Sequence, residues 1–265
     1  MSLPAEILDH ILSFLQPDTT ALETCSESHP SLCQLAEPYL YSDILLDTYE
    51  QRSKPANLTE LLSKRPYIAH YVRSLGIRVR EPHRRLEEIS TILPHLLALR
   101  RITLDHRSLH FGWEAQPESF RLAFLNCLRL QSMQDVCIKD VAGFPFMSAL
   151  NGECKSIRSL TVHRGRPYKN PSQISGLDLD GPFTNQGLPL KALRLARCQP
   201  HFLEGFVPWF TTCRSQLQSL EFFSSDGGCY DSLPKLLTWS SGSLTSLDLF
   251  LGLTRTRTSF LDIYS

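Results

Sequence analysis

The sequence predicts an α/β protein in which a small unit of three helices precedes a solenoid of short parallel strands, with helices on its convex side. Apolar residues recur at helical spacing over about the first 40 residues. From residue 73 onward, a short alternating apolar pattern occurs eight times. Charge supports the division, because residues 1–50 carry nine acidic residues and no Lys or Arg, whereas residues 51–110 carry twelve basic and five acidic residues.

These changes in pattern and charge predict the domain organisation. The helical unit is expected over residues 1–47, and a linker with the first helical connection over residues 48–72. The solenoid is expected over residues 73–265. Only LTRTRTSFLDIYS follows the last repeat, so we expect a solenoid whose C-terminal cap is missing.

The first helix is expected to begin near Pro4, because proline at a first-turn position loses no backbone hydrogen bond. Glu6 follows, where a carboxylate favours the positive end of the helix. The apolar residues then fall at helical spacing and give one broad face. They are Ile7, Leu8, Ile11, Leu12, Phe14 and Leu15.

Two further helices are expected in the acidic segment. Asp18 or Thr19 can cap the second helix, and Ser31 is the expected cap of the third. Pro38 interrupts the apolar stripe of the third helix. Three short helices with this much apolar surface cannot bury all of it among themselves. The excess either packs on the solenoid as a cap or contacts a partner protein.

Two stretches of this region share a pattern with a known family. They read Leu3-Pro4-x-Glu6-Ile7-Leu8-x-x-Ile11-x-x-Phe14-Leu15 and, farther on, Leu35-Ala36-x-Pro38-x-Leu40-Tyr41-x-x-Ile44. The pattern resembles an F-box, and more narrowly the F-boxes of fungal proteins. The match covers about 42 residues.

The resemblance implies a partner, a Skp-type adaptor, and through it the cullin of a ubiquitin ligase. The family often has an aromatic residue near the start of the third helix, where this chain has His29-Pro30-Ser31-Leu32. The family's adaptor is acidic, as is this segment, so the contact would depend on apolar burial. The residues implied to contact the adaptor are Leu3, Pro4, Ile7, Leu8, Ile11 and Leu15.

The repeated pattern of the body is an apolar-x-apolar pair, in which the paired side chains point to one face of a short strand. The steps between successive pairs run from 16 to 34 residues, and three of them are 27. Leucine-rich repeats have periods of about 20–29 residues. The pairs are Leu75/Ile77, Ile102/Leu104, Val136/Ile138, Leu160/Val162, Leu177/Leu179, Leu193/Leu195, Leu220/Phe222 and Leu247/Leu249.

This body resembles the irregular leucine-rich repeats that often follow a fungal F-box. Residues 86–97 and 120–130 have helical apolar spacing and are expected on the convex side. The alternative is an ordinary α/β domain with parallel strands.

The residues between the core positions of each strand are expected to form a concave face that binds a target protein. Its early part is basic, which could instead suit phosphate, and its later part is acidic with exposed aromatic side chains, typical of protein-binding surfaces. Arg164-Gly165-Arg166 is expected to be a surface loop. The candidate target-binding residues are Arg78, Arg80, Asp105, His163, Asp178, Asp180, Arg194, Glu221, Phe223, Asp248 and Phe250.

Catalytic chemistry is not predicted. The sequence has none of the common nucleophile, phosphate-binding or zinc motifs, and its cysteines have no metal-ligand spacing, so we predict no cofactor and no metal. Asp178 and Asp180 could form a metal or acid pair, but such a pair more often lies on a solvated face.

The setting of the protein follows from similar observations. The formal net charge is zero, which gives no reason to expect nucleic acid as a partner. Residues 1–15 lack the features of a signal peptide, and no apolar run is long enough for a membrane span. We therefore expect a cytoplasmic or nuclear protein that does not bind membranes.

The predicted function is that of a substrate-recognition adaptor of an SCF-type ubiquitin ligase, which is not itself an enzyme. The alternative is a leucine-rich-repeat scaffold unrelated to any ligase, with the N-terminal helices as its cap. A third and weaker hypothesis is an enzyme whose site is too dispersed to recognise in the sequence.

Overall fold

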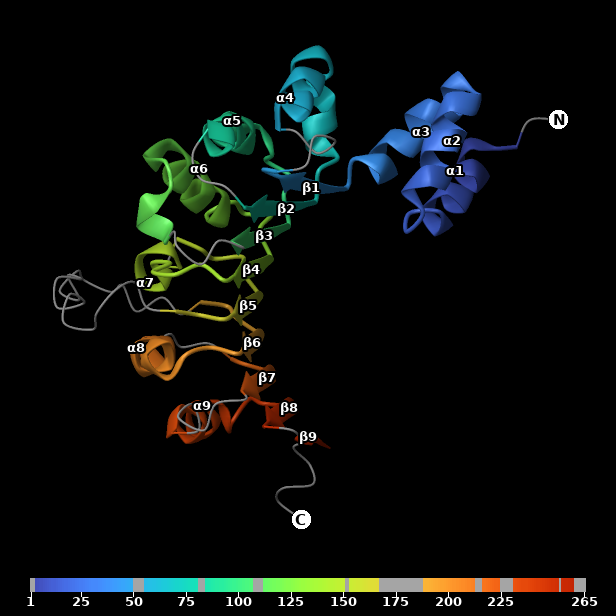
Figure 1. Ribbon diagram of the computed structural model, residues 1–265. Coiled ribbons are helices and arrows are strands. Elements are labelled where there is room, and N and C mark those ends of the chain that lie inside the picture. Colours follow the sequence, from blue (N-terminus) through green and yellow to red (C-terminus); the bar gives the residue numbers. More distant parts are fainter. Residues whose placement is uncertain are drawn as a thin grey trace.

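In the computed structural model, three N-terminal helices precede one sheet whose strands follow one another in sequence order (Figure 1). The structure describes residues 3–49, 55–80, 84–106, 112–150, 153–166, 188–212, 216–224, 231–252 and 254–259. The predicted α/β class and the arrangement of a helical unit before a repeat body are confirmed.

The N-terminal unit consists of α1 (Ala5–Phe14), α2 (Thr19–Ser28) and α3 (Pro30–Leu40). Its core is separate from that of the sheet and is built around one buried side chain from each helix. These are Leu12, Leu22 and Ala36, at 2%, 0% and 0% exposure. A core this small leaves much of the apolar surface of α1 outside it.

Local hydrogen bonds decide where these helices begin. Asp18 caps α2, since its Oδ1 accepts a hydrogen bond from the Ala21 amide at 3.0 Å. The prediction of Ser31 as the cap of α3 is wrong. His29 takes that place, its Nδ1 accepting from the Ser31 amide at 3.2 Å, because Pro30 already occupies the first helical position. The helix then continues through Pro38.

The sheet has β1 to β8 parallel and β9 antiparallel to β8 among the described residues. The strand at Leu177–Leu179 that the sequence predicted lies outside the described residues. The strands are β1 (Asp43–Asp47), β2 (Ser74–Val79), β3 (Arg101–His106), β4 (Asp135–Lys139), β5 (Ser159–His163), β6 (Ala192–Ala196), β7 (Ser219–Ser224), β8 (Ser246–Leu251) and β9 (Thr254–Ser259).

Two strands lie where the sequence analysis placed none. β1 falls within the range assigned to the helical unit and pairs in parallel with β2. β9 follows the last predicted repeat and pairs along the outer edge of β8. The range assigned to a linker contains α4 (Pro55–Lys64) and a 3₁₀ helix, η1 (Pro66–His70).

Helices cover one side of the sheet and give the molecule its curved outline (Figure 1). They include α5 (Arg84–Ile92), η2 (Leu93–His95), η3 (Trp113–Ala115), α6 (Glu118–Leu128), α7 (Phe146–Ala149), α8 (Pro200–Thr212) and α9 (Leu233–Ser240). The predicted helical segments at residues 86–97 and 120–130 are confirmed by α5 with η2 and by α6.

Strand side chains alternate between the core and the opposite face, as the apolar-x-apolar pattern requires. The first core position of each pair lies in register across the sheet, so that Leu75 neighbours Ile102 and Leu220 neighbours Leu247. All four side chains are at most 3% exposed. Each unit therefore buries its apolar side against the next one.

Aromatic side chains fill the space between strands and helices from Trp113 onward. Ring centroids lie 4.8 Å apart for Trp113 and Phe144, 5.5 Å for Phe146 and Phe206, and 5.0 Å for Phe210 and Trp239. Such pairs contribute about 0.5–1.5 kcal/mol each beyond their area burial. The irregular repeats are thus held together by large rings that bridge units of unequal length.

Among the described residues, none of the helices combines the length and the apolar character that crossing a bilayer requires.

Candidate interaction surfaces

The first surface is an apolar stripe on α1. Leu3, Ile7, Ile11 and Phe14 keep 56%, 48%, 46% and 72% of their surface exposed, while Leu12 on the opposite side is buried. Ile7, Ile11 and Phe14 share one face of α1, and Leu3 lies two residues before the helix begins. We refer to these four residues as the α1 stripe.

The structure also places the other residues implied to contact an adaptor. Pro4 is exposed, and Leu8 and Leu15 are half-buried. Phe14, the most exposed of the large apolar residues of α1, was missing from the predicted contact set. Its position seven residues after Ile7 was the signal that would have included it.

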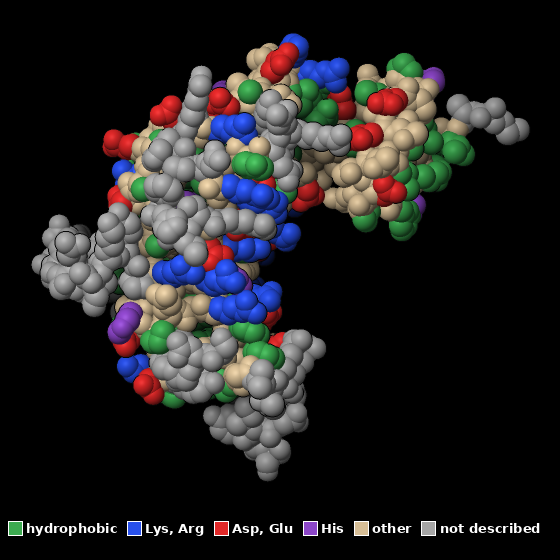
Figure 2. Space-filling model, in the orientation of Figure 1, with side chains coloured by type: hydrophobic (Ala, Val, Ile, Leu, Met, Phe, Trp, Pro, Cys, Tyr) green, Lys and Arg blue, Asp and Glu red, His purple; other side chains and the backbone are tan. Residues whose placement is uncertain are grey.

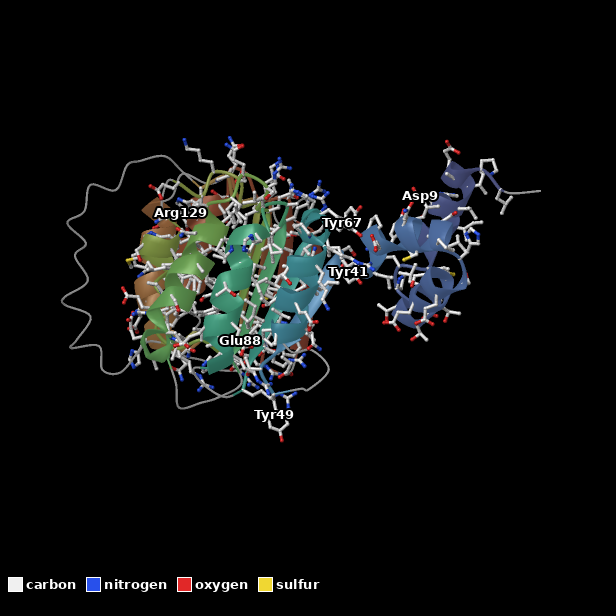
Figure 3. The ribbon with its side chains drawn as sticks, turned by 90° about the horizontal axis from the view of Figure 1, so that it is seen from above. Asp9, Tyr41, Tyr49, Tyr67, Glu88 and Arg129 are labelled. Carbon is white, nitrogen blue, oxygen red and sulfur yellow. The ribbon has the colours of Figure 1, made fainter. Side chains whose placement is uncertain are left out.

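The helical unit is fastened to the body through a buried carboxylate on α3. Glu37 is 6% exposed, and its carboxylate accepts hydrogen bonds from Arg65 Nη1 at 2.8 Å and from Tyr67 Oη at 3.0 Å. Burial raises the pKa of Tyr67, and its hydrogen bond to Glu37 raises it further. Figure 3 shows Tyr41 and Tyr67 where the two parts meet.

Backbone contacts strengthen the same junction. The Ser42 carbonyl accepts hydrogen bonds from the Arg73 and Ser74 amides at 2.8 and 2.9 Å. Gln16 Nε2 donates to Ser42 Oγ at 3.3 Å. The end of α3 is therefore tied to the first two strands, and the α1 stripe is held in a defined position relative to the sheet.

The second surface is the concave face, formed by the outward side chains of the parallel strands. Figure 2 shows the molecule hollowed beside the helical unit, with Lys and Arg side chains gathered along the margin of the hollow. Strand register aligns the predicted target-binding residues in two neighbouring rows. Arg78, Asp105, His163, Phe223 and Phe250 share one row, and Arg194, Glu221 and Asp248 share the other.

Three of the predicted target-binding residues belong to neither row as described. Arg80 follows directly after β2. Asp178 and Asp180 lie outside the described residues.

The basic residues at the first strands are paired with carboxylates. Asp47, whose side chain is fully buried, lies 3.4 Å from Arg78 Nη1 and 3.3 Å from Arg80 Nη2. Arg78 Nε is also 3.7 Å from an oxygen of Asp105. The positive charge that the sequence places on the early face is therefore compensated in the fold.

The pKa of Asp47 reflects this pairing. Burial alone would raise it, but a hydrogen bond from the Tyr49 amide together with Arg80 and Arg78 outweighs burial and lowers the pKa below 3.8. The carboxylate thus stays ionised at neutral pH and anchors both arginines.

The central strands carry a second group of cations, which we call the central cation cluster. Its members compete for few carboxylates. Asp140, 14% exposed, lies 3.4 Å from Arg164 Nη1 and 3.9 Å from Arg166 Nη2. Within the described residues, no carboxylate lies within ion-pair distance of Lys139 or Arg197. The cluster comprises Lys139, Arg164, Arg166, Arg194 and Arg197, of which Arg194 pairs with Glu221 at 3.2 Å.

The pKa of His163 responds to the positive charge of this cluster. Burial lowers its pKa below 6.5; Asp140 acts in the opposite direction, and Arg164, Arg197 and Lys139 lower it further. His163 is therefore neutral at pH 7, and its surroundings are already rich in positive charge.

Three residues that directly follow β4, β5 and β6 adopt the left-handed backbone conformation. They are Asp140, Arg164 and Arg197, with φ of 59°, 52° and 53°. Each backbone amide donates to a carbonyl of the next strand, as Arg197 does to Phe223 at 2.7 Å. This conformation costs a non-glycine residue about 1–2 kcal/mol. Equivalent turns in successive units bring these side chains to the same edge of the concave face.

The concave face ends in an aromatic pair. The rings of Phe223 and Phe250 stack at 4.3 Å with 5° between their planes. The guanidinium carbon of Arg197 lies 5.2 Å from the Phe223 ring centroid, within cation–π range. Both phenylalanines were predicted from the sequence, whereas Arg197 was not.

The sequence analysis missed Arg164, Arg166 and Arg197 as parts of one surface. The signal was their position: Arg164 and Arg197 each follow the last outward residue of a strand. Within the described residues, no group of three or more His, Cys, Asp or Glu side chains is placed to hold a metal ion.

Comparison with models of known protein families gave no match, and comparison with curated protein sequences gave none either. The functional argument therefore depends on the two surfaces themselves, which offer apolar contact on α1 and charged and aromatic contact on the concave face.

Proposed function

We propose that this chain is a substrate-recognition adaptor of an SCF-type ubiquitin ligase, in which the α1 stripe docks a Skp-type adaptor and the concave face binds a target protein. The observation that carries the proposal is the α1 stripe: four large apolar side chains, 46–72% exposed, on a helical unit with a core of its own. The stripe coincides with the segment whose sequence resembles an F-box.

Apolar burial supplies the binding energy in this proposal. Fully burying a Leu, Ile or Phe side chain contributes about 1.5–3 kcal/mol, so burying the exposed halves of the stripe gives about 1 kcal/mol per residue. Residues 1–50 are strongly acidic, so they repel an acidic partner at long range. Added salt screens this repulsion and should strengthen the contact.

The junction gives the proposed adaptor a defined geometry. Glu37 with Arg65 and Tyr67, and Ser42 with the first strands, fix the helical unit against the body. A ligase must hold its target at a set distance from the transferred ubiquitin, and a rigid junction serves this requirement. The target would occupy the hollow seen in Figure 2.

The second candidate function is a leucine-rich-repeat scaffold whose N-terminal helices cap the solenoid. The observation that favours it is the direct continuation of α3 into β1, the edge strand of the sheet. A cap, however, should bury its apolar surface on the body. If the helices are only a cap, deleting residues 1–41 unfolds the sheet. If they form a docking unit, the shortened chain keeps a cooperative unfolding transition and loses only adaptor binding.

The decisive experiment measures binding of a purified Skp-type adaptor to the variant Ile7→Asp, Ile11→Asp by calorimetry. Placing two charges in an apolar interface should weaken binding by at least about a hundredfold. Leu122→Asp is the matched control, because Leu122 is a similarly exposed leucine on α6, on the convex side. Equal binding by both variants, or absence of wild-type binding at micromolar concentration, would remove the proposal.

A further inference from the structure

We propose that the target segment is an extended acidic stretch of polypeptide followed by an aromatic or large aliphatic residue, bound across β4 to β8 by Lys139, Arg164, Arg197 and the Phe223–Phe250 pair. This inference rests on the proposed function, since it names the class of target that the concave face receives. It also makes a claim about binding that needs no ligase.

The first step is the location of uncompensated charge. Arg78 on β2 and Arg80 directly after it are already engaged by the carboxylates of Asp47 and Asp105. In the central cation cluster, Asp140 is shared between Arg164 and Arg166, while Lys139 and Arg197 have no carboxylate within ion-pair distance among the described residues. An incoming carboxylate finds its partners at the central strands.

The second step is the turn geometry of the cluster. Arg164 and Arg197 hold φ values of 52° and 53°, which glycine would adopt without steric cost. Strained backbone positions often accompany functional surfaces. Here the strain keeps two long cationic side chains at the same edge of successive strands. Their effect on neighbouring His163, whose pKa is lowered by burial and by these cations, agrees with a focused positive potential.

The third step is the change in side-chain chemistry along the concave face from β4 to β8. Strand register continues from Lys139 through His163 and Ala196 to Phe223 and Phe250. Along this row the side chains change from cationic to small to aromatic. A ligand that crosses the strands therefore meets charge first and an apolar platform afterwards.

The dimensions set the length of the ligand. Parallel strands lie about 4.8 Å apart, so the row from β4 to β8 spans roughly 19 Å. An extended chain rises about 3.3 Å per residue, so about six residues cover this distance. About three or four acidic residues would lie over Lys139, Arg164 and Arg197, and an aromatic residue about two positions farther would reach Phe223 and Phe250.

The observations favour a polypeptide over a nucleic acid. The whole chain has no net charge, and the helical unit, which borders the hollow, belongs to the acidic segment of residues 1–50. Nucleic acid carries regular backbone charge and would be repelled there, whereas an acidic stretch that ends in an apolar residue has its charge confined to one part. Arg197, stacked on Phe223, joins the two parts of the surface.

The test is fluorescence anisotropy on the full chain with a labelled peptide that contains about four consecutive Glu residues and, about two residues later, a Phe. Binding is expected, and it should weaken about tenfold in Arg197→Gly. Because glycine suits the backbone at this position, the variant should melt at the wild-type temperature or above it. Arg129→Ala is the matched control, because Arg129 lies at the end of α6 on the other side of the molecule (Figure 3) and should leave the affinity unchanged.

Further peptides separate the chemical sources of the charge. A phosphoserine peptide that binds as well as the Glu peptide supports the proposal, because both present anions to the same cations. Replacing Glu by Lys should abolish binding, and replacing Phe by Ser should weaken it. Absence of binding by both acidic peptides, equal weakening by Arg129→Ala, or tighter binding of single-stranded oligonucleotide than of either acidic peptide would overturn it.

The outcome is independent of the adaptor experiment. Ile7→Asp, Ile11→Asp leaves the concave face unchanged, so it should keep full peptide affinity. If the chain binds the peptide but no Skp-type adaptor, this inference stands and the proposed function does not. If it binds the adaptor but no acidic peptide, the proposed function stands and only the target class is wrong.

Discussion

The first and the central strands of the concave face both carry arginine, but in different electrostatic settings. At β2, Arg78 and Arg80 converge on Asp47, whose side chain is fully buried. At β5 and β6, Arg164 shares the partly exposed Asp140, and Arg197 lies against an aromatic ring. Residues of the same type therefore stabilise the fold in one region and present charge to a ligand in the other.

The comparison shows that segment charge is a poor guide to surface charge. Residues 51–110 are the most basic part of the sequence, with a net charge of +7. Their arginines at the concave face are nevertheless compensated by Asp47, which belongs to the acidic N-terminal segment, and by Asp105. The fold brings opposite charges from separate segments together, which moves the uncompensated charge to the central strands.

The largest effect that separates the two regions is expected from Asp47→Asn. The change keeps the acceptor for the Tyr49 amide but removes the charge that holds Arg78 and Arg80. Breaking a fully buried pair costs about 3–5 kcal/mol, and the partial exposure of both arginines reduces this to about 2–3 kcal/mol. Urea unfolding at neutral pH measures the loss in the free energy of unfolding.

Asp135→Asn is the control for that experiment. Asp135 pairs with Arg101 at 3.2 Å, but the two side chains are 35% and 60% exposed, so its loss should cost less than about 1 kcal/mol. The pKa of Asp47 is lowered in the fold, so its contribution is present above pH 3.8 and is lost as the pH falls through the folded pKa. The gap between wild type and Asp47→Asn should therefore close in acid. If Asp47→Asn and Asp135→Asn lower the free energy of unfolding equally, the arginines at the first strands do not have the structural role assigned to them.

An intermediate effect is expected when substitutions of two arginines, Arg78 on β2 and Arg197 after β6, are compared. Arg78→Ala should lower stability by about 1–2 kcal/mol, because it removes a partner of a buried carboxylate. It should leave acidic-peptide affinity unchanged. Arg197→Gly should do the opposite, with unchanged or greater stability and about tenfold weaker binding, or about 1.4 kcal/mol.

Melting curves and anisotropy titrations on the same samples test this difference between Arg78→Ala and Arg197→Gly. If Arg78→Ala weakens peptide binding as much as Arg197→Gly does, the ligand lies over the first strands as well. The proposed restriction to the central strands would then be wrong.

The sequence predicted the fold well because the fold depends on periodicity. The apolar-x-apolar pairs specify strands whose core sides must stack, and seven of the eight predicted pairs lie in parallel strands of the described sheet. β1 escaped because residues 1–47 were assigned to the helical unit, although Ile44 and Leu46 lie opposite the core positions Leu75 and Ile77 of β2. β9 escaped because TRTRTS has no apolar alternation and is placed by backbone pairing with β8.

The candidate surfaces were predictable to different degrees. Helical spacing predicted a broad apolar face on α1, and the F-box resemblance supplied the contact set, which lacked Phe14. The concave rows follow from strand alternation, so Phe223 and Phe250 were found. Arg164 and Arg197 were not, since they lie beyond the strand ends and reach the surface only through a left-handed turn. Compensation of Arg80 by Asp47 joins the end of β1 to the residue that follows β2, which no local pattern reveals.

The smallest expected effect concerns His163, which lies among Lys139, Asp140, Arg164 and Arg197. Its folded pKa lies below 6.5, so protonation costs folded stability as the pH falls below that value. A bound acidic peptide favours the protonated ring, so peptide affinity should rise about threefold between about pH 7.5 and about pH 5.5, where the Glu residues of the peptide remain ionised. His163→Gln should abolish this rise and leave the affinity at pH 7.5 unchanged. A rise that persists in the variant would place the titrating group elsewhere, and a fall would contradict a carboxylate bound beside His163.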